Sequence, residues 1–208
     1  LTPYFRPYLG GIERAIEQLT FQIQESQQVE SVAVLTTKYA FPRVPHPDWA
    51  DRETTEEGIG IYRLKGFPKH SIPLYSCPLV WFSPMQVRSF LKEFNPNVVH
   101  FVGDGWFWGH FWSWFWYHSR ARFVFTPSYH KLPLIRWWLR PINAFICNVV
   151  DNVIALTSQE ANLVRRDYLV PRKKLGIIGW GAPAPENPVL PEPPGEGEPI
   201  TLLCVGRL

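Results

Sequence analysis

A pair of glycines near the start of the chain has the composition and position of a phosphate-binding loop. Gly10 and Gly11 precede a stretch in which Ile12, Ile16 and Ile23 recur at helical spacing between charged and polar residues. The first amides of a helix lack intrahelical partners and carry the positive end of its dipole, and glycine has no Cβ to block an oxygen-rich ligand. An anion would therefore bind here. The alternative is that the pair only makes a tight turn between a strand and a helix.

The segment 105–117, GWFWGHFWSWFWY, is the most unusual in the chain. Its apolar run is too short to span a bilayer. A buried helix would use more leucine, isoleucine and alanine, whereas tryptophan and tyrosine prefer the boundary between membrane and water. We therefore expect Trp106, Trp108 and Trp112 to lie on a surface that faces a membrane or an acceptor. Core packing is the alternative.

A second segment, 130–147, mixes aromatic and aliphatic side chains with basic ones. No acidic residue occurs between Asp104 and Asp151. This combination suits an anionic membrane surface, and the alternative is core packing beside a solvated basic edge. The residues expected to face the membrane from this segment are Lys131, Arg136, Trp137, Trp138 and Arg140.

Composition places the chain among globular intracellular proteins. It has 208 residues, of which 46% are hydrophobic, so it can bury a core. The net charge of +3 is too small to indicate nucleic acid, and no nucleic-acid-binding motif occurs. Cys77, Cys147 and Cys204 are odd in number and lack metal-like spacing, which predicts free thiols in a reducing compartment. No signal peptide opens the chain, so we expect a cytoplasmic location.

The elements that would position these residues alternate between strand and helix, which predicts an α/β fold: a Rossmann-like parallel sheet with helices on both faces. Ser83, Pro84 and Gln86 have the pattern of a capped helix start, and Thr157 and Glu160 have the spacing of a capping box. The proline-rich segment 38–58 and the segment from 65 to 82 are expected to be irregular. Short apolar runs predict strands at 32–36, 60–64, 97–102, 122–126, 152–156 and 175–178.

The composition also predicts domain boundaries. Residues 182–199 are rich in proline, glycine and glutamate, which is typical of a semi-rigid linker. We expect residues 1–181 to form one domain whose first strand is truncated. Residues 200–208 would then form the first strand of a second α/β domain.

Five motifs in order resemble the N-terminal domain of a glycosyltransferase of family 4. They are PYFRPYLGGIER, NVVHFVGDG, FVFTPSYH, DNVIALTSQEANLVRRDYLVPRKKLGIIGWGAP and, after the linker, TLLCVGRL. The resemblance implies a GT-B fold, in which two Rossmann-like domains face each other across a cleft. The acceptor would bind mainly to the first domain and the sugar nucleotide mainly to the second. It also implies retaining transfer of a hexose from a UDP- or GDP-sugar, with no obligatory metal and no other cofactor.

The resemblance assigns roles to individual residues. It implies that Gly10, Gly11 and Arg207 contact the donor diphosphate, whose growing negative charge must meet amides and cations in the transition state. Family members often have histidine at the position of Ser128, so His130 is the candidate for the acceptor-side catalytic role, and Ser128 would hydrogen-bond a sugar. His100 matches a family histidine and is the third catalytic candidate, with a structural role as its alternative.

These observations favour an enzyme: a glycosyltransferase acting on a lipid-linked or polysaccharide acceptor at the inner face of the cell membrane, where it would be peripheral. Residues 1–208 alone are expected to be inactive. The alternative is a non-catalytic Rossmann-like module that binds a membrane or a partner. A sugar-nucleotide epimerase is a third reading, but the glycine pair lacks the G-x-G-x-x-G spacing of a nicotinamide-binding site.

Overall fold

A computed structural model describes residues 1–7, 10–40, 44–68, 80–103, 106–129 and 136–181, with the backbone alone at 44, 67–68, 80–81 and 136–139. The predicted linker and second domain therefore lie outside the described residues. The helices are α1 (Gly11–Glu25), α2 (Pro84–Phe94), α3 (Phe107–Tyr117), α4 (Arg136–Val149), α5 (Ser158–Tyr168) and the 3-10 turn η1 (Arg172–Lys174). The strands are β1 (Ala33–Thr37), β2 (Tyr39–Ala40), β3 (Val44–Pro45), β4 (Arg52–Thr54), β5 (Gly60–Leu64), β6 (Gly66–Pro68), β7 (Val80–Phe82), β8 (Val98–Val102), β9 (Arg122–Thr126), β10 (Asn152–Ala155) and β11 (Leu175–Ile177).

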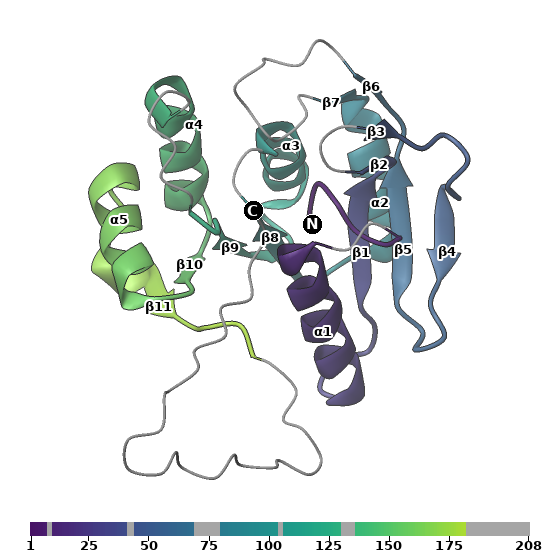
Figure 1. Cartoon of the computed structure of the whole chain (residues 1–208), viewed down its shortest axis with the longest axis horizontal. Coiled ribbons are helices and arrows are strands. Elements are labelled where there is room, and N and C mark those ends of the chain that lie inside the picture. The colour runs from purple at the N-terminus through teal and green to yellow at the C-terminus, as the bar shows by residue number, and fades with distance from the viewer. Residues whose placement is uncertain (8–9, 41–43, 69–79, 104–105, 130–135, 182–208) are drawn as a thin grey trace, which may run out of the picture.

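Two sheets form the centre of the fold (Figure 1). One has four parallel strands in the order β11-β10-β9-β8, and the other has three in the order β1-β5-β4, with β4 antiparallel to β5. The first residues of the chain lie between them. Thr2 N donates to Leu35 O of β1 at 3.1 Å, and Val102 N of β8 donates to Leu1 O at 2.9 Å. Backbone hydrogen bonds of residues 1–2 thus join the two sheets edge to edge.

Helices cover both faces of this layer. Side chains of α2, α3, α4 and α5 pack on one face, around a large buried cluster that includes Phe101, Phe123 and Phe125. On the other face α1 packs through Ile16 against a smaller cluster that includes Val34 and Ile61, and it stands apart from the other helices in Figure 1. The alternation of side chains along each strand directs successive residues to opposite faces, so one apolar strand supplies both clusters. The predicted Rossmann-like α/β fold is confirmed.

The predicted strands that are short apolar runs are confirmed to within one residue at most boundaries. The irregular segments are where the prediction was wrong. Residues 38–58 contain β2, β3 and β4, and residues 65–82 contain β6 and β7. These strands are two or three residues long, and β4 carries exposed polar side chains, so no apolar pattern marks them. Each forms an antiparallel pair with the strand next to it in the chain, β2 with β3, β4 with β5 and β6 with β7, so hydrogen bonds between neighbouring strands define them.

The capping role predicted for Gln86 is also wrong. α2 does begin at Pro84 after Ser83, but no side chain caps its first amides. The Gln86 side chain instead accepts from Lys65 N at 2.9 Å and donates to Lys65 O at 3.0 Å. An amide side chain satisfies both backbone groups of a neighbouring loop as well as it would cap a helix, and tertiary contact decides between the two.

Candidate active site

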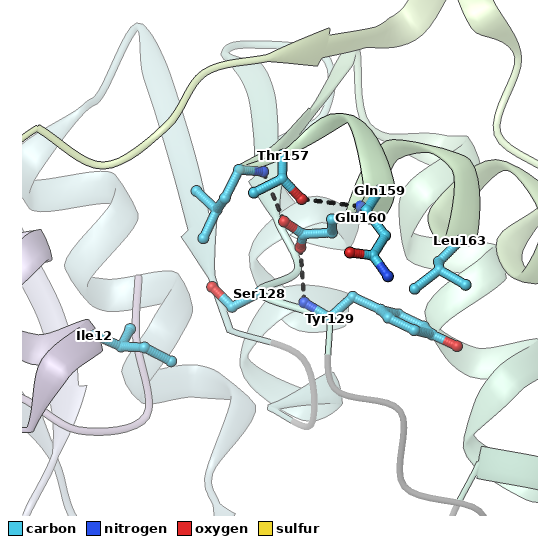
Figure 2. A pocket seen from close by; sticks show the side chains of 8 residues that line it. Ile12, Ser128, Tyr129, Thr157, Gln159, Glu160 and Leu163 are labelled. Carbon is cyan, nitrogen blue, oxygen red and sulfur yellow. Dashed lines mark hydrogen bonds between the residues drawn. The ribbon is translucent and has the colours of Figure 1, made fainter. Parts of the chain in front are cut away.

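A pocket of about 320 Å³ lies at the carboxyl ends of β9 and β10, between the first turns of α1 and α5. In open α/β sheets this edge is where ligands bind. Figure 2 shows Ile12 of α1 on one side, the first turn of α5 on the other, and Ser128 and Tyr129 between them. The lining residues are Ile12, Ser128, Tyr129, Leu156, Thr157, Gln159, Glu160 and Leu163. The wall therefore combines aliphatic and aromatic surface with hydroxyl, amide and carboxylate groups.

Gly10 and Gly11 are at the start of α1, directly before Ile12 of the pocket wall. Gly10 is the N-cap residue with φ −98° and ψ −171°, and no side chain caps the helix. Neither glycine has a positive φ, so the backbone here does not require glycine. A Cβ added at Gly11 would meet no atom within 4 Å. The missing side chain leaves open space beside the first amides of α1, which the tight-turn alternative does not explain.

Glu160 holds the far side of the pocket together. Thr157 caps α5 by accepting from Glu160 N at 3.1 Å, as the capping-box spacing predicts. The Glu160 carboxylate, however, accepts from Leu156 N at 2.6 Å and from Tyr129 N at 2.7 Å. It therefore ties the end of β10 to the segment after β9 and fixes the position of Tyr129. The capping-box spacing of Thr157 and Glu160 is visible in the sequence, but the hydrogen bond from Tyr129 N to Glu160 is not.

Among the predicted site residues, Ser128 is the one in the described segments that lines the pocket. The residue is 6% exposed, and its Oγ has no hydrogen-bond partner among the described residues. Its φ of +48° lies in the left-handed region, which non-glycine residues adopt at a cost of about 1–3 kcal/mol when the surroundings enforce it. Buried hydroxyls are normally hydrogen-bonded, so a partner from a ligand would complete this one.

His100 lies apart from the pocket lining, within β8. Its Nε2 is 2.8 Å from Thr126 Oγ1, and burial lowers the pKa of the ring to about 4. The imidazole is therefore neutral near pH 7 and is held by the last residue of β9. This arrangement matches the structural alternative for His100, and its catalytic role stays a prediction. His130 and Arg207 lie outside the described residues.

Trp106 is buried, contrary to the expectation that it faces a membrane or an acceptor. It is 2% exposed and contacts Phe82, with ring centroids 5.7 Å apart. A Cβ at Gly109 would be 2.7 Å from the Trp106 ring, so the glycine allows the indole to lie against α3. Trp106 precedes the helix, and its side chain folds under the first turn. Trp108 and Trp112 are half-buried and pack against the core from α3.

The Arg140 side chain is 47% exposed and also binds carbonyls of α5, so its place on a membrane surface stays a prediction. Its Nε donates to Asp167 O at 2.7 Å and its guanidinium donates to Arg166 O at 3.3 Å. These are carbonyls of the last turn of α5, which lack partners within the helix. Arg140 thus caps α5 and connects it to α4. The backbones of Arg136, Trp137 and Trp138 begin α4 as a helix, and Lys131 lies outside the described residues.

The exposed aromatic side chains of this region are ones that the sequence did not single out. Phe115 of α3 is 45% exposed and Phe145 of α4 is 41% exposed. Phe111 and Trp114 contact Phe145, with ring centroids 6.3 and 5.7 Å apart. We call these four residues, Phe111, Trp114, Phe115 and Phe145, the α3–α4 aromatic surface. No helix in the described part of the chain is both long and apolar enough to cross a membrane.

Within the residues that the structure describes, no group of three or more His, Cys, Asp or Glu side chains is arranged to hold a metal ion. Cys147, the one cysteine of the described segments, is buried in the core. The described pocket therefore offers hydrogen-bonding groups and helix N-termini as its chemistry.

Comparison with known proteins agrees with this geometry. The chain resembles the crystal structure of a glycosyltransferase from Rickettsia africae ESF-5, with a TM-score of 0.54 and 14% sequence identity. The match covers 86% of this chain and 41% of that protein, so the chain spans less than half of its length. No curated protein matches the sequence. The family model of Glycosyltransferase Family 4 matches residues 9–183, and the chain therefore belongs to that family.

Proposed function

We propose that this chain is the acceptor-side domain of a retaining glycosyltransferase that moves a hexose from a UDP- or GDP-sugar to a lipid-linked or polysaccharide acceptor. The observation that carries the proposal is the open start of α1 beside the pocket at the carboxyl edge of the sheet. Family membership supports glycosyl transfer as the reaction. The pocket and the open start of α1 support the proposed positions of the acceptor and the donor.

The donor diphosphate would meet the uncapped amides of α1. A diphosphate oxygen can approach Gly11 because no Cβ intervenes and no side chain occupies the first amides. As the bond between the anomeric carbon and the diphosphate breaks, negative charge grows on the leaving group. Preorganised amides and the helix dipole stabilise that charge more in the transition state than in the ground state. Arg207 is proposed to add a cation from the second domain, and no metal ion is required.

The acceptor would lie in the pocket, with the reacting hydroxyl toward α1. Ser128 Oγ and the Gln159 amide can hydrogen-bond sugar hydroxyls, while Tyr129 and Leu163 provide the apolar surface on which a sugar ring packs. In the transfer, the acceptor oxygen forms the new bond to the anomeric carbon and its proton leaves with the diphosphate. His130 follows Tyr129 directly and is proposed as the acceptor-side catalytic group.

Membrane attachment is proposed to occur through the α3–α4 aromatic surface. Two of its members, Phe115 and Phe145, expose about two fifths or more of their area. The chain from 105 to 150 carries basic but no acidic residues, so its charge complements an anionic bilayer. This placement would bring a lipid-linked acceptor to the enzyme at the inner face of the cell membrane.

A donor screen tests the proposed activity. The protein expressed from its complete gene would be incubated with labelled UDP- and GDP-hexoses and a membrane lipid extract. We expect label to pass from one donor to the lipid or glycan fraction, with the anomeric configuration retained when the product is examined by NMR. Failure to bind or use any nucleoside diphosphate sugar would refute the proposal, and an inverted product would refute the retaining mechanism.

Vesicle sedimentation tests the membrane surface separately. Phe115→Ser combined with Phe145→Ser removes two half-exposed rings, worth about 2 kcal/mol of membrane affinity together, so binding to phosphatidylglycerol vesicles should weaken about 30-fold. Ile178→Ser is the control, because Ile178 is 60% exposed but lies outside this surface. Equal losses in the two proteins, or no loss in either, would contradict the proposed surface.

A further inference from the structure

Arg63 is a cation buried at the end of β5. The residue is 4% exposed and its side chain 1% exposed. Its guanidinium donates to three groups: Ala50 O at 3.1 Å, Glu53 Oε1 at 2.6 Å and Arg6 O at 2.7 Å. Its Nε has no hydrogen-bond partner among the described residues. One carboxylate, itself 41% exposed, is therefore the charged partner of a fully enclosed guanidinium.

Packing alone does not account for a charge at this position. Removing a guanidinium from water costs several kcal/mol even when it is paired, and a hydrophobic side chain of similar volume is often neutral or stabilising in its place. The neighbouring Ile61 and Leu64 of β5 are buried apolar residues, as this layer requires. What Arg63 adds is a rigid planar guanidinium that reaches three acceptors on two separate segments of chain, one at Arg6 and the other at residues 50–53.

One of those segments leads into the glycine pair. Residues 1–7 run from the centre of the sheet toward Gly10, and three side chains hold them. Thr37 Oγ1 donates to Pro3 O at 2.7 Å, the Arg6 side chain pairs with Glu17 of α1, and Arg63 donates to Arg6 O. The same guanidinium holds Ala50 and Glu53 of the long connection between β1 and β5. Arg63 thus couples the approach to α1 to the rest of the domain.

We propose that Arg63 is a positioning residue for the donor site: by fixing the Arg6 carbonyl, it sets where the chain enters Gly10 and the first amides of α1. The inference rests on the proposed function, since those amides bind the donor diphosphate there. Displacing a binding group by about 1 Å can cost on the order of 100-fold in rate, so a remote anchor of this loop affects transfer.

The test compares Arg63→Lys with Arg52→Lys in the protein expressed from its complete gene. Lysine keeps the charge but replaces the fork by a single ammonium, which cannot reach all three acceptors. Arg52, on the adjacent strand β4, is the matched control. Its guanidinium also pairs with a carboxylate, that of Glu93, through two hydrogen bonds of 2.6 and 2.8 Å, but the Arg52 side chain is exposed. We expect Arg63→Lys to raise the KM for the donor about tenfold, with the KM for the acceptor and the circular dichroism spectrum unchanged. Arg52→Lys should leave the donor KM unchanged.

Two further readouts separate positioning from a loss of folded protein. Partial unfolding lowers the maximal rate without changing the donor KM, so a normal donor KM in Arg63→Lys overturns the inference. Hydrogen exchange of amides in residues 1–16 should quicken in Arg63→Lys and not in Arg52→Lys, and equal exchange also overturns it. If wild-type protein binds no donor, the proposed function fails while the exchange result still tests the anchor. If Arg63→Lys does not fold, Glu53→Gln carries the same comparison, because it neutralises the partner and keeps an oxygen acceptor.

Discussion

Gly11→Val separates the two explanations for the glycine pair. If the pair serves only a tight turn, a side chain there should strain the fold and leave ligand binding intact. If the first amides of α1 bind a diphosphate, the side chain should block the ligand and leave the fold intact. The structure favours the second pattern, because Gly11 has no positive φ and a Cβ there would meet nothing within 4 Å.

The expected magnitudes follow from these facts. Valine is a better helix former than glycine by less than about 0.5 kcal/mol, and the first helical position feels only part of that difference. The free energy of unfolding should therefore change by no more than about 0.5 kcal/mol. Donor binding should lose two charge-assisted hydrogen bonds of about 1.5 kcal/mol or more each, for a total of about 3 kcal/mol. The dissociation constant would rise about 100-fold.

Urea unfolding and isothermal titration with UDP- and GDP-sugars measure the two quantities on the same protein. Gly176→Val in β11 is the matched control, since a Cβ at Gly176 also meets nothing within 4 Å and the residue lies outside the pocket lining. This control should bind the donor normally. A Gly11→Val protein that is destabilised by more than about 1.5 kcal/mol and binds the donor as tightly as wild type would refute the phosphate-binding role.

Three further predictions concern stability. Gly109→Ala should lower the free energy of unfolding by about 1–3 kcal/mol, although alanine is the better helix former, because its Cβ would lie 2.7 Å from the Trp106 ring; a gain in urea resistance would contradict this packing. Glu160→Ala should cost about 2–4 kcal/mol by leaving two strand-end amides without an acceptor, and Glu160→Gln, which keeps one acceptor oxygen, should cost less; equal thermal shifts would show that the amides find other partners. Burial lowers the pKa of His100 to about 4 and that of His110 well below 6.5, so the unfolded chain binds protons first as the pH falls. The contribution of both rings to stability is therefore complete above about pH 6.5 and declines toward pH 4, by about 1.4 kcal/mol per pH unit for each ring. His110→Phe should reduce the dependence of the unfolding free energy on pH by the contribution of one ring. An unchanged dependence in denaturant titrations at several pH values would show that His110 does not contribute to it.

The sequence by itself determined the order of the main strands and helices. The runs at 60–64 and 122–126, in which aromatic and β-branched residues predominate, became β5 and β9 with the expected bounds, because such side chains favour a half-buried strand. The glycine pair followed by an amphipathic repeat predicted a helix directly after the pair, and α1 begins one residue earlier, at Gly11. These signals are local, so neighbouring residues suffice to produce them. The order of the sequence motifs likewise indicated the family.

Tertiary structure alone decided which polar groups meet. The β4 strand exists because β5 offers it hydrogen-bond partners, and Gln86 turns from its own helix to Lys65 for the same reason. The sequence does not indicate whether an aromatic residue such as Trp106 is buried or exposed. In the structure Trp106 is buried, because the absence of a side chain at Gly109 leaves room for its ring. Glu160 and Arg63 act on residues about 30 and 57 positions away. Such contacts depend on how the sheet brings strand ends together, and hydrophobic periodicity does not encode that.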